Sequence, residues 1–149
     1  MAVELFDPQL VIARLAAQLP PPALKQRGGA ADFAAVKPEA RILPAAFVLE
    51  LANRASRNSL ATLAVSQQNE IRFGVVLAVQ NLRDPRGEKA HADMRTLRQS
   101  VMTALLGWQP DPDYDVVEYG GGRLLQLDNL VLWWQDDYIT SILERSILT

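Results

Sequence analysis

The sequence contains no cysteine and only one histidine among its 149 residues. Without cysteine, the chain can form no disulfide and offers neither a thiolate nucleophile nor the ligands of a cysteine-based zinc site. The histidine, His91, lies two residues from Asp93, and this spacing puts the two side chains on different faces of a helix. We therefore expect His91 to be a solvated surface residue, and we expect no transition-metal site.

The sequence has no large excess of positive or negative charge, and it has no long apolar run. The net charge is −2 and the isoelectric point is near 5.4, which leaves no positive field to attract nucleic acid or an anionic membrane. No uncharged apolar run approaches the roughly 18–20 residues of a membrane-spanning helix. The opening sequence, MAVELFD, lacks the basic and apolar regions of a signal peptide. We expect a cytoplasmic protein, bacterial or viral, that binds neither membranes nor specific nucleic-acid sequences.

Two motifs resemble ligand-binding loops, but neither has the required context. Residues 120–122 are Gly-Gly-Gly, yet Arg123 and an apolar run follow them, whereas a phosphate-binding loop continues with Lys-Ser/Thr and a helix. Three aspartates alternate as in a calcium loop, but prolines interrupt them and the glycine and final glutamate of that loop are missing: Asp111, Asp113 and Asp115. We predict backbone turns at both places, with no catalytic, cofactor-binding or metal site, and hence no enzyme.

The residues that are present suit one globular domain. Hydrophobic residues make up 49% of the chain and charged residues 21%, which are ordinary values for a protein with a packed core. The length also matches a single domain, so we expect residues 1–149 to fold as one unit.

Two segments are predicted to be helices with defined ends. The first begins at Asp7 as the N-cap, with Pro8 at the first helical position, and stops before Pro20. The second is long and ends near Gly107. Its apolar stripe contains Met94, Leu97, Val101, Ala104, Leu105 and Trp108, and we expect its opposite face to carry Arg95, Arg98, Gln99 and Thr103. Residues 30–36 can form two further helical turns around Phe33.

Strands are predicted between and after these helices, at residues 41–51, 60–65, 71–79, 115–127 and 130–135. Pro44 indicates an edge strand or a bulge in the first, and the glycines at 120–122 indicate a kink or a turn in the fourth. Residues 136–140 either continue the last strand or loop away, and residues 141–149 are helix or, as we prefer, strand. Turns are expected at 83–87 and 128–129, a break between strands at 66–70, and a polar loop or hairpin tip at 53–59. Strands grouped between helices predict an α+β fold with a mainly antiparallel, mixed sheet packed by one long and one or two shorter helices.

Two tryptophans occupy neighbouring positions in one predicted strand and so point to opposite faces of the sheet. One of Trp133 and Trp134 can fill the core against the long helix. The other needs cover from a further element of the chain or from another subunit, since tryptophan is enriched at interfaces. Both explanations stay open.

A projecting basic segment is the other candidate interface. Arg54 and Arg57 lie among small polar residues that cannot bury themselves, so we expect them to project. They can then meet acidic groups of a neighbouring subunit such as Asp136 or Asp137, whose strand end we also expect to be exposed. A solvated hairpin tip is the alternative. The candidate subunit interface is therefore Arg54, Arg57, Trp133, Trp134, Asp136 and Asp137.

The C-terminal half contains turn and core residues in a recognisable order: LLGW at 105–108, Pro110, EYGGGRL at 118–124, LVLWWQD at 130–136 and YIT at 138–140. This pattern resembles the tail terminator and minor tail protein family of Mu-like and related long-tailed bacteriophages. The resemblance implies a virion protein, assembled in the bacterial cytoplasm, that forms a hexameric ring on the tail tube. Such a ring stops tube growth and presents a surface to the head-side connector. The alternatives are a head–tail connector or neck completion protein and, from another class, a small cytosolic enzyme.

Overall fold

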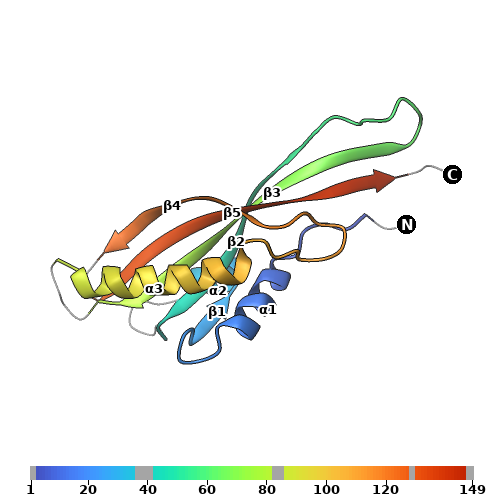
Figure 1. Ribbon diagram of the computed structural model, residues 1–149. Coiled ribbons are helices and arrows are strands. Elements are labelled where there is room, and N and C mark those ends of the chain that lie inside the picture. The colour runs from blue at the N-terminus through green and yellow to red at the C-terminus, as the bar shows by residue number, and fades with distance from the viewer. Residues whose placement is uncertain (1–2, 36–41, 82–85, 128–129, 147–149) are drawn as a thin grey trace.

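The computed structural model describes residues 3–35, 42–81, 86–127 and 130–146. Figure 1 shows the elements in chain order: α1 (Pro8–Gln18), β1 (Gln26–Gly28), α2 (Ala30–Ala35), β2 (Ala45–Ala55), β3 (Val65–Gln80), α3 (Glu88–Leu105), β4 (Glu118–Leu127) and β5 (Val131–Ser146). The strands form one sheet in the order β1-β2-β3-β5-β4, in which only the β1–β2 pair is parallel. The predicted α+β fold with a mainly antiparallel, mixed sheet is confirmed.

The main core lies on the face of the sheet that packs against α1 and α3. The alternating apolar residues of β3 point into it, and so do all six stripe residues of the long helix, although Trp108 lies beyond the helix end and is only partly buried. The β3 residues buried on this face are Ile71, Phe73, Val75, Leu77 and Val79. The apolar residues of β3 recur at every second position, and those of α3 recur with the period of a helix. Both elements could therefore be located from the sequence.

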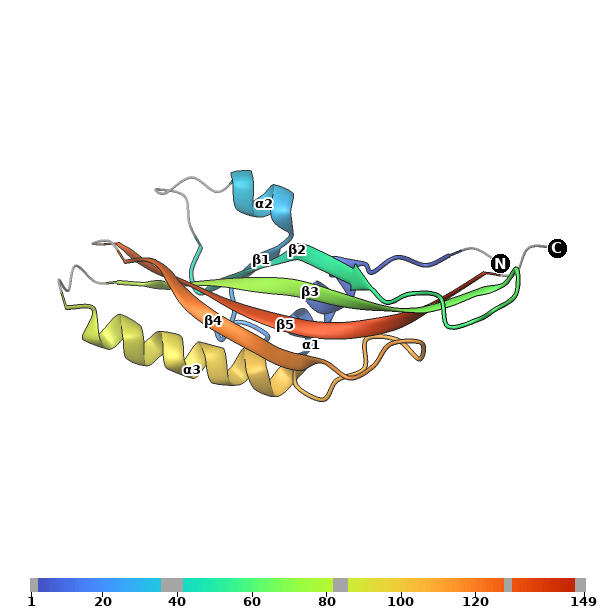
Figure 2. The ribbon, with the colours of Figure 1, turned by 90° about the horizontal axis from the view of Figure 1, so that it is seen from above.

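A smaller apolar cluster lies on the opposite face, beneath α2. Figure 2 shows α2 and α3 on opposite sides of the sheet. Phe33 of α2 packs its ring against Phe47 of β2 and Trp133 of β5, with ring centroids 5.5 and 5.7 Å away. The six-residue helix therefore covers one end of the second face and turns Trp133 into a core residue.

The ends of the helices follow the local chemistry of the sequence. The Asp7 carboxylate accepts a hydrogen bond of 2.9 Å from the Gln9 amide, as an N-cap should, and Pro8 takes the first helical position. Helix α3 starts after Gly87 and stops before Gly107, and both glycines have a positive φ that disfavours other residues.

The predictions for the β2–β3 region were partly wrong. Strand β2 starts after Pro44, lies between β1 and β3 rather than at an edge, and has its irregularity between Glu50 and Ala52. It includes residues 53–55, which we expected in a loop, and β3 runs unbroken through 66–70, where we expected a break. The strand predicted at 60–65 is wrong up to Ala64, because residues 56–64 form the connecting loop.

The last two strands are longer than the sequence indicated. Strand β4 continues through the three glycines, with a register shift between Tyr119 and Gly121, so the kink was the correct alternative to a turn. Residues 115–117 precede it. Strand β5 continues through 136–140 and ends at Ser146, which confirms the strand interpretation as far as the structure describes the chain. The predicted turn at 128–129, most of that at 83–87, and residues 36, 41 and 147–149 lie outside the described residues.

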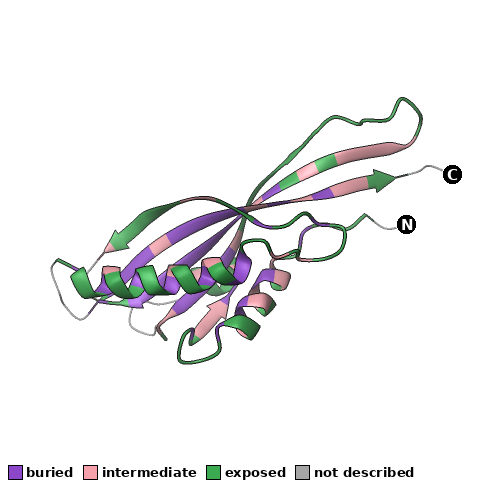
Figure 3. Cartoon of the chain, in the orientation of Figure 1, coloured by how far each residue is buried: buried purple, intermediate pink, exposed green. Residues whose placement is uncertain are grey.

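The sheet extends beyond the helices as an arm. The arm consists of the end of β2, the loop 56–64, the start of β3 and the end of β5 (Figure 1). Exposed and half-buried residues dominate it (Figure 3). Since neither face of the arm tip is packed, its strands depend on the backbone ladder rather than on an apolar stripe.

Candidate assembly surfaces

A charged cluster is buried between α3 and the sheet. Asp136 of β5 is fully buried, and its carboxylate accepts hydrogen bonds from Arg98 Nε at 2.8 Å and Arg98 Nη2 at 3.1 Å. The Tyr119 hydroxyl and Trp134 Nε1 donate two further bonds, each of 2.9 Å. Four donors and a two-point ion pair compensate the desolvation of this carboxylate.

The side chains of this cluster fit together only because residue 122 of β4 is a glycine. A Cβ built at Gly122 of β4 would overlap Asp136 Oδ1 and approach the Tyr119 hydroxyl within 2.8 Å. The guanidinium of Arg98 also lies 4.3 Å from the centroid of the Trp134 ring. The cluster therefore ties the edge strand β4 and helix α3 to β5.

We expected Arg98 on the face of α3 opposite the apolar stripe, and this expectation was wrong. Its side chain is only 26% exposed. It follows Met94 by four residues and precedes Val101 by three, and these two spacings place it beside the buried stripe. This spacing is the signal that could have identified it.

A second cluster lies on the other face of the sheet around Asp137. Its carboxylate lies 3.3 Å from Arg72 Nη1 and 3.8 Å from Arg123 Nη1, and it accepts a 2.8 Å hydrogen bond from Gln135 Nε2. Arg72 reaches it because the register pairs Gly74 with Asp137, so Arg72 lies two residues further along the same face. No pattern in the sequence identifies this pairing.

Burial raises the pKa of every tyrosine in the chain. Desolvation raises the pKa of Tyr114 to about 12 and raises that of the fully buried Tyr138 further. The pKa of Tyr119 is also raised, first by desolvation and then by its hydrogen bond to the Asp136 carboxylate. The folded protein therefore favours the neutral, protonated form of each tyrosine.

The arm presents both arginines that the sequence singled out. Arg54 and Arg57 are exposed, and within the described ranges neither forms an ion pair. At the tip, Leu60 and Leu63 are 44% and 85% exposed. The arm therefore ends in apolar side chains next to positive charge.

Strand β4 forms an open edge of the sheet in the part of the chain that the structure describes. Strand β4 pairs with β5 on one side, and no described strand pairs with its other side. Leu124 and Leu125 are exposed along it. An open edge with apolar side chains is a surface that a partner can cover.

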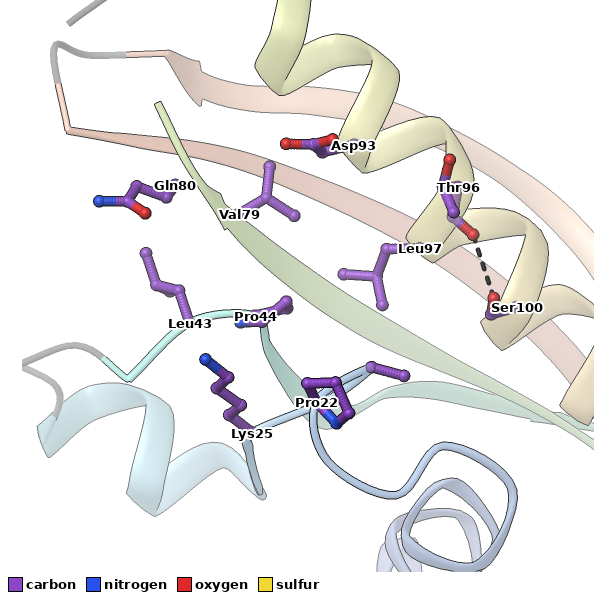
Figure 4. A pocket seen from close by; sticks show the side chains of 11 residues that line it. Pro22, Lys25, Leu43, Pro44, Val79, Gln80, Asp93, Thr96, Leu97 and Ser100 are labelled. Atoms are coloured by element: carbon purple, nitrogen blue, oxygen red, sulfur yellow. Dashed lines mark hydrogen bonds between the residues drawn. The ribbon is translucent and has the colours of Figure 1, made fainter. Parts of the chain in front are cut away.

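A groove of about 400 Å³ lies between α3, the end of β3 and the start of β2. Figure 4 shows Leu43, Pro44 and Val79 on the strand side, facing Leu97 on the helix. Polar residues surround this apolar floor: Lys25, Gln80, Asp93, Thr96 and Ser100. In the part of the chain that the structure describes, no group of three or more acidic or histidine side chains is placed to hold a metal ion.

Comparison with known proteins decides the family. The model of the phage tail terminator protein family matches residues 1–147. The chain belongs to the phage tail terminator family. No curated protein matches the chain. Tail terminators are structural proteins, so this protein is a structural component of a bacteriophage tail and not an enzyme, which overturns the enzyme alternative.

None of the described helices of the tail terminator combines the length and apolar character needed to span a bilayer.

The structure separates the six residues predicted as a subunit interface. Arg54 and Arg57 lie on the exposed arm, as expected. Asp136 and Asp137 are not exposed, so the expectation of an accessible acidic strand end was wrong: both are engaged in ion pairs within the chain.

Both tryptophans also find cover within the tail terminator. Trp134 packs against the main core, and Trp133 packs against Phe33 and Phe47. Of the two explanations left open, a further element of the same chain accounts for their burial. A role for either residue at a subunit interface stays a prediction.

Proposed function

We propose that this tail terminator assembles into a closed ring, a hexamer by family resemblance, that caps the tail tube. The ring ends tube polymerisation and offers the attachment surface for the head-side connector. The observation that carries the proposal is the family match, which spans residues 1–147 of 149 and so includes the whole described fold.

The shape of the subunit supports assembly through two different surfaces. The arm projects beyond the helices (Figure 1), and the groove lies beside α3 next to the start of β2 (Figure 4). Identical copies that join through two unlike surfaces form a ring when the rotation between them closes. Exposed leucines on the arm and on β4 supply apolar area for such contacts.

The proposed partners are other copies of the chain, the tail tube protein and the head-side connector or neck protein. We place the protein in the virion, at the head-proximal end of the tail, after assembly in the host cytoplasm. The overall charge of −2 gives no support to nucleic-acid or membrane binding, and the proposed role requires neither.

Electron microscopy and genetics test this function together. Purified protein should form rings, and light scattering across a concentration series should detect species heavier than a monomer. In phage lacking the gene, tails should be overlong or headless, and the cloned gene should restore uniform, headed tails. A monomer at every concentration, with and without tube, would contradict the ring. Normal tube length combined with missing heads would instead favour the head–tail connector alternative, and labelling of the occupied junction would settle it.

A further inference from the structure

We propose that the arm tip of one subunit docks into the groove between α3 and the start of β2 on the next copy. The tip is the loop 56–64 with Leu60 and Leu63, and the groove is the one drawn in Figure 4. The inference rests on the proposed ring and names the contact that would join its subunits.

The tip is an ordered loop although its leucines are exposed. The Asn58 side chain accepts hydrogen bonds from the Leu60 amide at 3.1 Å and the Ser66 amide at 2.8 Å, and donates one to the Ala64 carbonyl at 3.1 Å. The Ser59 hydroxyl donates to the Ser66 carbonyl at 3.0 Å. These bonds hold the loop while it presents Leu60 and Leu63 to solvent. A preorganised loop loses less conformational entropy when it docks.

The groove has the complementary character. Its floor is formed by Leu43, Pro44, Val79 and Leu97, and its rim is polar. Its volume of about 400 Å³ is at the small end of the range of roughly 300–1,000 Å³ for pockets that enclose a compact ligand. Two leucine side chains from a narrow loop are ligands of this kind.

The tip cannot reach the groove of its own subunit. Strand β2 starts beside the groove, directly after Pro44, and ends in the arm at Ala55 (Figure 1). Eleven extended residues at about 3.3 Å each separate the two by roughly 35 Å. Any chain segment like the tip that fills the groove must therefore come from another molecule, and a second copy supplies one.

The rim of the groove carries one basic and one acidic side chain, Lys25 and Asp93, and the acidic one can pair with an arginine of the arm. Arg57 lies in the tip loop and Asp93 on the rim of the groove, both exposed, and within the described ranges neither forms an ion pair. The buried Asp136 and Asp137 are not available to the arm, whereas Asp93 is. Complementary charges at the rim would fix the register of the docked loop.

The lack of cysteine in the chain allows a direct test. Leu63→Cys in the tip and Ser100→Cys on the groove rim are combined in the full-length protein and treated with a short bis-maleimide, whose reach tolerates small differences in register. We expect a ladder of covalent oligomers up to the size of the ring. Each single variant, and Leu63→Cys combined with Glu118→Cys at an exposed position of β4 seven strand positions from the groove residue Val79, should give no ladder.

The outcomes separate this inference from the proposed ring. A ladder only with the Ser100 pair supports docking in the groove. Oligomers seen by light scattering without that ladder would overturn the docking contact and leave the ring intact. A strict monomer, with and without tail tube, would overturn both. Cross-linking to tube protein but not between copies would show that the tip binds the tube instead.

Two further pairs of variants test the apolar and the charged part of the contact. Leu63→Asp should raise the concentration for half-assembly about ten- to hundred-fold, because a buried leucine becomes a buried charge. The matched control Leu5→Asp, at another exposed leucine, should leave it unchanged. Arg57→Asp should weaken assembly, and adding Asp93→Arg should restore it. Failure of the swap to restore assembly would remove Asp93 as the partner of Arg57.

Discussion

Arg98 of α3 and Asp136 of β5 form a two-point ion pair, with Nε–Oδ2 and Nη2–Oδ1 distances of 2.8 and 3.1 Å. The carboxylate is fully buried, whereas the arginine reaches the surface. This pair joins the long helix to the central strands, and Tyr119 adds the edge strand β4 through a 2.9 Å hydrogen bond to the same carboxylate. The ion pair and its hydrogen bonds therefore fix α3 and β4 against β5.

The first prediction concerns this ion pair. Arg98→Ala leaves a buried carboxylate without its cation and should lower the free energy of unfolding by about 3 kcal/mol, the low end for a broken buried pair because Arg98 is partly exposed. Arg95→Ala, an exposed arginine on the same helix, should cost less than about 0.5 kcal/mol. Urea unfolding measures both. Equal midpoints and slopes for the two variants would show that the pair adds nothing to stability.

A second prediction concerns the space that β4 leaves for the carboxylate. Gly122→Ala would place a methyl group against Asp136 Oδ1, the Tyr119 hydroxyl and Trp134 Nε1, and should destabilise the fold by about 1–3 kcal/mol through overpacking. Gly29→Ala is the matched control, since its Cβ would meet atoms no closer than 3.9 Å. Thermal melts of the two variants should separate clearly. If Gly122→Ala melts like Gly29→Ala, β4 can move away from Asp136 at little cost.

Some helices and strands could be predicted from the sequence because burial of one face gives them a periodic apolar pattern, and others lack such a pattern. Helix α3 and residues 71–79 of β3 could be predicted because each buries one face, which imposes a period on the chain. The outer part of the β2–β3 hairpin could not, because both faces of the arm tip meet solvent and the backbone ladder alone defines the strands. Residues 66–70 are polar although they lie in a strand, and residues 60–64 are mostly apolar although they lie in the loop, which is the reverse of the usual pattern.

The candidate surfaces were only partly predictable for a related reason. The exposure of Arg54 and Arg57 follows from their polar neighbours, but the burial of Asp136 depends on Arg98, thirty-eight positions away in the sequence. Two adjacent aspartates usually indicate a solvated strand end. Here they point to opposite faces of a central strand, and each meets an arginine from another element. Only the tertiary pairing reveals those partners.

The third prediction concerns stability at high pH. The pKa of Tyr114 is raised from 10.0 to about 12, and the pKa values of Tyr119 and Tyr138 are raised as well, each mainly by burial. The unfolded chain therefore loses its phenolic protons first. Stability from the neutral tyrosines is fully present below pH ~10 and falls as the pH rises, by up to about 1.4 kcal/mol per pH unit for each tyrosine that is still protonated in the folded state.

Absorbance of tyrosinate and circular dichroism, followed together from neutral to alkaline pH, check this prediction. The folded protein should show little tyrosinate near pH 10, and the main rise should coincide with the loss of structure. A free tyrosine amide titrated in parallel gives the reference. Ionisation of Tyr114 or Tyr138 at the reference pH, with the fold unchanged, would contradict the burial of that side chain.

The last prediction concerns the arginines of the arm. Replacing Arg54 and Arg57 by glutamate should change the free energy of unfolding by less than about 0.5 kcal/mol, because both side chains are exposed and unpaired among the described residues. Assembly should nevertheless weaken. An exposed ion pair contributes only ~0.2–1 kcal/mol, but a ring repeats it at every subunit contact. The measurement is tail length in phage complemented with the double variant, with Lys89 and Arg95 of α3 replaced by glutamate as the control of equal charge change. Overlong or headless tails with the arm variant alone would place the arm in tube termination, whereas uniform, headed tails with both variants would show that its charges have no part in it.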